Sequence, residues 1–118
     1  MVFGIGLDQF LYVYTPRYVR PAAWSERFTS HPHNLILDLW LSLGILGLIV
    51  AAGYAFVLVR RATQARALRS GLATAALAAI VAGFLHGLVD NGYFLPDLAL
   101  VWWFLTALIE AESRPSVA

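Results

Sequence analysis

Three runs of apolar residues, separated by short polar segments, dominate the pattern of hydrophobic and polar positions along the chain. The first run, residues 39–59, carries no charged residue. An α-helix rises about 1.5 Å per residue, so this run can cross the ~30 Å hydrocarbon core of a bilayer. Pro32 is a helix-start signal and extends the first helix back to residue 34. The pattern predicts a transmembrane region over residues 34–112, with three membrane-spanning helices at about 34–59, 72–89 and 95–109.

Residues 1–33 have a different pattern, in which aromatic and charged side chains are mixed without a long apolar run. Three prolines, at positions 16, 21 and 32, prevent a long helix in this region. We therefore expect a loop region with short helical turns at about residues 8–14 and 22–28. Residues 113–118 follow the last run and are expected to form a short tail.

The composition supports a membrane location. Hydrophobic residues make up 60% of the 118 residues, charged residues only 13%, and the mean hydropathy is +0.72. A soluble domain of this size buries only part of its surface and could not cover so much apolar area. The net charge of +1 predicts no nucleic-acid partner, and the lack of cysteine excludes disulfides and thiolate chemistry. The predicted fold class is all-α, a polytopic transmembrane helical bundle.

Arginines decide the predicted orientation. Arg60, Arg61, Arg66 and Arg69 lie between the first two apolar runs, where we expect a short basic loop without an acidic residue. Such loops stay in the cytoplasm by the positive-inside rule. Residues 1–33 and the turn Asp90-Asn91-Gly92 are then extracytoplasmic, and residues 113–118 are cytoplasmic.

This orientation gathers polar residues at the outer membrane face. Ionisable groups beside a membrane span are costly, so they usually face a cavity or a partner. Asn34 and Asp38 are spaced i, i+4, as are His86 and Asp90. A histidine paired with a carboxylate can serve as a general base. Structural readings stay open, because His86 could be a packing residue and Asp90 a turn residue. The candidate site residues at this face are His33, Asn34, Asp38, His86 and Asp90.

Three further candidates are arginines of the adjoining loop, Arg17, Arg20 and Arg27. Guanidinium groups bind phosphate bidentately and remain charged at every working pH. The alternative is solvated loop charge or contact with lipid headgroups. Pro32 holds His31 and His33 in an extended geometry and no metal-binding spacing occurs, so we expect neither a metal nor a cofactor.

Glycines in the first two spans are expected to allow close helix packing. Gly44 and Gly47 lie one turn apart, and Gly83 and Gly87 form a GxxxG pattern.

The stretch from His31 to Gly47 resembles the signature of the O-antigen ligase and polymerase family. That signature is His, then Asn, Ser or Gln, nine residues, Gly, two residues and Gly, and it is matched by His33, Asn34, Gly44 and Gly47. The next position, usually Thr or Val in the ligases, is Leu48. The turn Gly4-Ile-Gly6 and the segment from His86 to Phe94 are also similar to family motifs.

The resemblance implies a metal-independent, inverting glycosyl transfer in the bacterial inner membrane, with a periplasmic active face. A glycan would leave an undecaprenyl pyrophosphate carrier and join a sugar hydroxyl of an acceptor. His33 would be the general base on the acceptor hydroxyl, or would orient that hydroxyl. Loop arginines would hold the pyrophosphate, and the other polar candidates would bind or support the acceptor. Such enzymes have ten or more spans, so we expect this chain to be a C-terminal portion that needs the N-terminal helices of the same protein. Ligase, polymerase and protein glycosyltransferase remain alternatives.

A non-enzymatic membrane module, such as a transporter fragment or a helical assembly subunit, is the competing reading. In that case His86 and Asp90 would belong to a proton or substrate path. The position of the His33 motif outside the membrane favours the enzyme, because transporters place key polar groups near the midplane.

Overall fold

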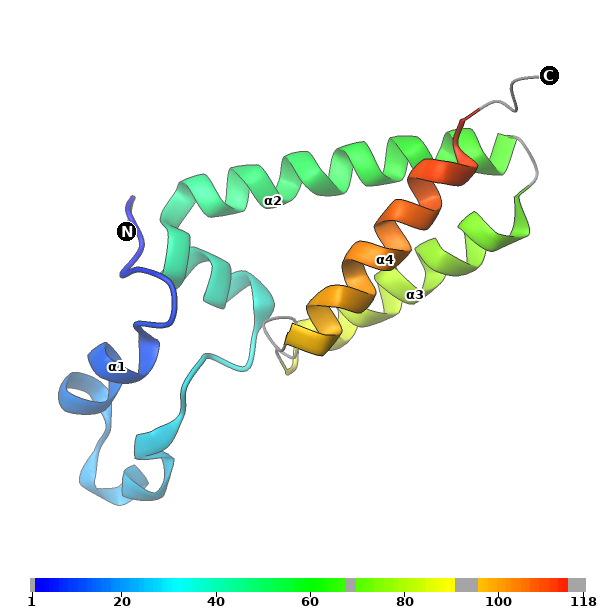
Figure 1. The fold of residues 1–118 in the computed structure, drawn as a ribbon. Coiled ribbons are helices and arrows are strands. Elements are labelled where there is room, and N and C mark those ends of the chain that lie inside the picture. The colour runs from blue at the N-terminus through cyan, green and yellow to red at the C-terminus, as the bar shows by residue number, and fades with distance from the viewer. Residues whose placement is uncertain (1, 68–69, 91–95, 115–118) are drawn as a thin grey trace. The chain divides into compact units, whose positions relative to one another are not determined.

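The computed structural model of the chain describes residues 2–67, 70–90 and 96–114, and the regular secondary structure in these ranges is helical, with no strand in them (Figure 1). The predicted all-α class is therefore confirmed for the described residues. The elements are α1 (Phe10–Tyr18), the 3₁₀ helix η1 (Pro21–Phe28), α2 (Leu35–Ala67), α3 (Gly71–Gly87) and α4 (Pro96–Glu112).

The helices form two compact units. The first contains Met1–Ala51 with Gly87–Asn91, and the second contains Ala52–His86 with Gly92–Ala118.

Helix length bears directly on the expected membrane spans. Within the described residues, α2 is the one helix that is both long and apolar enough to cross a bilayer, and an 18-residue stretch of it has a mean hydropathy of 2.3. α3 and α4 have 17 residues each, which at the α-helical rise is about 26 Å. Residue 95, the expected start of the third span, and residues 115–118 of the expected tail lie outside the described residues. That three helices cross a membrane stays a prediction.

In the first unit, α2 is broken at Gly44. This residue has φ 69° and ψ −159°, a conformation that is open only to glycine. The expectation of one uninterrupted helix is wrong here, and Gly44 serves the break rather than helix packing. The ribbon changes direction at this point, so that residues 35–43 form a short arm and residues 45–67 a longer one (Figure 1).

The N-terminal segment satisfies the backbone groups that the break releases. The Ile45 amide donates to the Val2 carbonyl at 3.1 Å, and the Ile5 amide donates to the Leu41 carbonyl at 2.7 Å. A third bond runs from the Gly6 amide to the Ser42 carbonyl at 3.1 Å. A Cβ on Gly4 would collide with that same carbonyl, so glycine is needed for the close approach of the two backbones.

The expected short helical turns near the N-terminus are present as α1 and η1, and Pro16 lies inside α1. Phe10 and Tyr14 stack with ring centroids 4.9 Å apart, and Tyr18 follows on the same helix face. The Thr15 hydroxyl donates to the Arg27 carbonyl at 2.5 Å and joins the two elements.

The second unit has a core of small residues. Its buried cluster is Leu58, Ala62, Ala65, Ala73, Ala76, Ile80 and Ile109. A Cβ on Gly83 would lie 3.1 Å from the Trp102 ring, so the expected close packing at this glycine is confirmed. Large apolar side chains are exposed instead; Phe56, Leu100 and Phe104 each expose about two thirds of their surface.

Two expectations about helix ends are wrong. Arg60, Arg61 and Arg66 belong to α2 rather than to a loop, because the segment has good helix formers and no glycine or proline. Arg69 lies outside the described residues. α3 ends at Gly87, two residues earlier than expected, so Asp90 follows the helix instead of belonging to it.

Candidate functional site

The first unit brings His33 and Asp90 together. The His33 Nδ1 atom lies 2.9 Å from the Asp90 Oδ1 atom, and the two side chains are 63% and 60% exposed. A carboxylate can only accept, so the Nδ1–H group of His33 is the donor of this bond. In the neutral imidazole the Nε2 atom then carries the lone pair. The pair therefore presents a basic nitrogen with a fixed tautomer to solvent.

Local structure places the two residues side by side although 57 positions separate them. His33 stands just before α2, and Asp90 stands just after α3. Asn34 caps α2, since its Oδ1 atom accepts from the Leu37 amide at 3.0 Å. Its Nδ2 group donates to the Leu88 carbonyl at 2.8 Å and so contacts the turn that carries Asp90.

These contacts correct one of the two pairs that the sequence spacing suggested. Asp90 pairs with His33, whereas the i, i+4 argument had placed it with His86 on one helix. Asp38 keeps the expected i, i+4 spacing from Asn34, because its amide donates to the Asn34 carbonyl at 2.9 Å. Its side chain is buried, and its Oδ1 atom accepts from the Ser42 hydroxyl at 3.2 Å. Asp38 is therefore a buried residue of the short arm of α2, close to the Leu41 and Ser42 carbonyls that bond to the N-terminal segment.

His31 lies beside the pair. Its ring contacts the His33 ring edge-on with centroids 5.3 Å apart, and its Nδ1 atom is 3.4 Å from the Pro32 carbonyl. Of the residues that the structure describes, no group of three or more His, Cys, Asp or Glu side chains could hold a metal ion.

The three loop arginines have different surroundings. Arg17 lies in the last turn of α1 and Arg20 just before η1, and both are exposed. Arg27 stacks on two rings instead, 4.4 Å from the Phe28 centroid and 5.4 Å from that of Trp24. It also donates to the Trp24 carbonyl at 2.9 Å. Arg27 thus has a local structural role, whereas Arg17 and Arg20 present their guanidinium groups to solvent.

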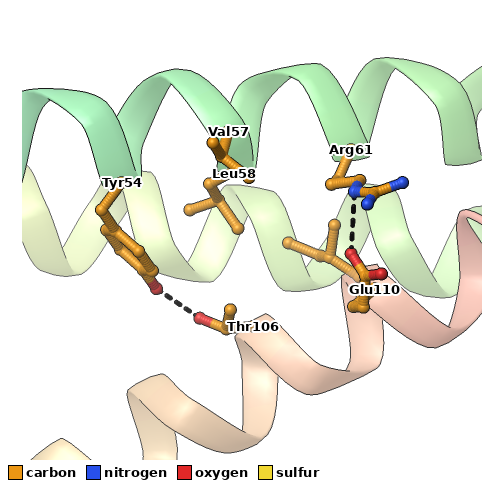
Figure 2. Close-up of a pocket in the computed structure, with 7 residues that line it drawn as sticks. Tyr54, Val57, Leu58, Arg61, Thr106 and Glu110 are labelled. Carbon is orange, nitrogen blue, oxygen red and sulfur yellow. Dashed lines mark hydrogen bonds and ion pairs between the residues drawn. The ribbon is translucent and has the colours of Figure 1, made fainter.

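His86 belongs to the second unit, where it is exposed in the last turn of α3. That unit has a small open pocket between α2 and α4 (Figure 2). Arg61 Nε pairs with Glu110 at 3.0 Å at one end of it, and the Tyr54 and Thr106 hydroxyls lie 2.5 Å apart at the other. Its polar groups satisfy one another, so we regard them as ties between helices rather than as a reaction site.

Sequence reasoning missed two members of the site. The Leu88 carbonyl is a backbone group, so its role as an acceptor cannot be predicted from the residue type. Ser42 follows Asp38 by four positions, and this i, i+4 spacing could have identified it as the partner of a buried carboxylate.

Comparison of the chain with models of known protein families, with curated proteins and with solved structures gave no match.

Proposed function

We propose that this chain is the portion of a membrane glycosyltransferase that carries its general base, in an enzyme of the O-antigen ligase and polymerase type. The observation that carries the proposal is the exposed His33–Asp90 pair, with its 2.9 Å bond. The signature residues His33 and Asn34 both lie in this site, just before α2. The other two signature residues, Gly44 and Gly47, lie within α2.

The chemistry follows from the fixed tautomer. An acceptor hydroxyl hydrogen-bonded to His33 Nε2 would lose its proton to that nitrogen while its oxygen attacks the anomeric carbon of the glycan. The bond from that carbon to the carrier pyrophosphate breaks, and the leaving group takes the electron pair. Attack from the opposite face inverts the anomeric configuration. Asp90 stabilises the imidazolium that forms, and the proton then passes to solvent.

The first unit also has exposed arginines that could bind the pyrophosphate leaving group. A lipid-linked pyrophosphate gains negative charge as the glycosidic bond breaks, and guanidinium groups offset such charge. Arg17 and Arg20 are the candidates for this role, since Arg27 is engaged by Trp24 and Phe28. We propose that further helices of the same protein complete the carrier site.

The packing of the second unit supports a lipid environment for the enzyme. Its helices meet through alanines and Gly83, while Phe56, Leu100 and Phe104 point outward. Small residues at helix contacts and large apolar residues outside are typical of proteins whose solvent is lipid. We propose three membrane-spanning helices, with the His33–Asp90 pair on the extracytoplasmic side.

Genetic complementation tests the proposed function. The gene is deleted in its source bacterium and the intact protein is re-expressed with His33→Ala. We expect the glycan product to disappear from the cell surface and the lipid-linked donor to accumulate, with an unchanged amount of protein in the membrane. Asp97→Asn, an exposed change in the first turn of α4, is the control and should restore the product. A normal amount of product in the His33→Ala strain would contradict the proposal.

A transport module is the second candidate, because α2 is interrupted inside an apolar stretch and Asp38 is buried beside the break. Discontinuous helices with polar groups at the break line substrate paths in many transporters. The same strain separates the two candidates. A transporter defect leaves the donor on the cytoplasmic face, whereas a transferase defect leaves it on the outer face.

A further inference from the structure

The Asn34 side chain bonds in two directions at once. Its Oδ1 atom accepts from the Leu37 amide, and its Nδ2 group donates to the Leu88 carbonyl. The reversed amide would set two donors against each other at Leu37 and two acceptors at Leu88, so one orientation alone satisfies both contacts. A Cβ on Gly87 would lie 3.3 Å from Leu35 Cβ, and the two backbones are therefore in close contact beside this amide.

The position of these bonds matters for the His–Asp pair. Asn34 follows His33 directly, and Leu88 precedes Asp90 by two residues. The Leu88 carbonyl comes just after the end of α3, in the stretch where carbonyls lack partners within the helix. The Asn34 amide therefore joins the start of α2 to the turn after α3, within one unit.

The small energy of an exposed ion pair explains why the hydrogen bond from Asn34 to the Leu88 carbonyl is needed. A solvent-exposed ion pair contributes only about 0–1 kcal/mol, which is too little to order two side chains on separate segments. His33 and Asp90 are both more than half exposed. The hydrogen bond from the Asn34 side chain to the Leu88 carbonyl is partly buried, so water competes with it less. It also holds the backbone of the turn directly.

We propose that Asn34 is the positioning residue of the His33–Asp90 pair, not a ligand of the substrate. The hydrogen bond from the Leu37 amide to Asn34 fixes where α2 begins, and so the position of His33 just before it. The hydrogen bond from Asn34 to the Leu88 carbonyl sets the distance from Asp90 to His33 Nδ1. The catalytic meaning of this role rests on the proposed function; the geometry does not.

Asn34→Asp separates the tether from the cap. Aspartate caps helices as well as asparagine does, but it has no N–H group to donate and places a carboxylate against the Leu88 carbonyl. Asn34→Ser is a second variant that keeps a cap and lacks the amide. Asp90→Asn removes the direct partner of His33 and sets the scale of the expected change.

The measurement is the tautomer of His33, read from its side-chain ¹⁵N shifts in the full chain, labelled with ¹⁵N-histidine and held in lipid nanodiscs. The chain has three histidines, and His33→Gln assigns the signals. We expect the Nδ1–H tautomer in the unaltered chain and a tautomer mixture in Asn34→Asp, Asn34→Ser and Asp90→Asn. Far-UV circular dichroism checks that the helices are retained.

The inference is overturned if the Nδ1–H tautomer persists in both folded Asn34 variants, whether or not it is lost in Asp90→Asn. In the intact enzyme we expect kcat of Asn34→Asp to fall about 10²-fold, because a small misplacement of a catalytic group has effects of this size. Loss of the tautomer without any change in kcat would leave the tether standing and contradict the proposed function. The two failures are thus distinguishable.

Discussion

At the scale of single residues, the bond between His33 and Asp90 selects which ring nitrogen is basic. The Nδ1–H group faces the carboxylate at 2.9 Å, so Nε2 is the atom that can receive a proton. α3 ends at Gly87, so Asp90 lies in the turn after this helix, where it meets His33.

Asp90→Asn tests the carboxylate directly. An amide in this place can offer its N–H group and stabilise the wrong tautomer, and it cannot offset the imidazolium charge. We expect kcat for glycan transfer to fall about 10²-fold or more. Asp97→Asn, which removes an exposed carboxylate from α4, should leave kcat unchanged. Equal kcat values for the two variants would exclude Asp90 from the site.

Arg20→Ala tests the proposed binding of pyrophosphate. A hydrogen bond to a charged group contributes about 1.5–3 kcal/mol, so its loss should raise KM for the lipid-linked donor roughly 10- to 100-fold. Arg114→Ala removes an exposed arginine that the account places on the cytoplasmic side, and it is the matched control. If both variants have the same KM for the donor, the role given to Arg20 is wrong.

At the scale of elements, the break in α2 organises the first unit. It turns one apolar helix into a short arm that ends beside the N-terminal segment and a longer arm of about 35 Å, the length of a membrane span. The short arm holds His33 and Asn34 at its start and buries Asp38 within it. Any change that straightens α2 therefore moves the residues of the site.

Gly44→Ala should destabilise the protein, with Gly53→Ala as its control. Gly44 has a φ of 69°, and an added Cβ would collide with the Val2 carbonyl. The conformation alone accounts for about 1–3 kcal/mol of lost free energy of unfolding. Gly53 lies in regular helix with nothing within 4 Å of an added Cβ, so its variant should be as stable as wild type or more so. Unfolding of both in mixed detergent measures the difference; equal stability would argue against the break.

The sequence predicts some elements well and others poorly, for physical reasons. Pro32 indicated a helix start at residue 34, and α2 begins at Leu35. The break at Gly44 could not be predicted from the sequence, because a glycine within an apolar run is equally typical of close packing between helices. What selects the break is the bond from Ile45 to Val2, which joins segments far apart in sequence. The pairing of His33 with Asp90 is likewise a tertiary contact, although both were predicted at the same site.

At the scale of the whole molecule, we propose that residues 1–33 lie outside the cell and the arginines of α2 inside. The positions of Arg60 and Arg61 in a helix do not weaken the orientation, because arginines at a helix end extend toward the interface. The second unit, with its alanine core and exposed large side chains, is consistent with lipid around it.

Cysteine labelling tests this topology, since these 118 residues contain no cysteine and any cysteine elsewhere in the intact protein can first be replaced by serine. In cells expressing the intact protein, Ser25→Cys should react with a membrane-impermeant maleimide added outside, and Gln64→Cys should react only after the membrane is opened. Both positions are exposed in the structure. Labelling of Gln64→Cys in intact cells would reverse the orientation and place the His33–Asp90 pair in the cytoplasm.

The most direct test of the central claim is the single-turnover rate of glycan transfer by the purified intact protein in proteoliposomes, compared between wild type and His33→Gln. Glutamine can still bond to Asp90 but cannot accept a proton from a hydroxyl. We expect the rate to fall about 10²- to 10⁴-fold while the affinity for the lipid-linked donor is unchanged. A wild-type rate in the His33→Gln enzyme would contradict it.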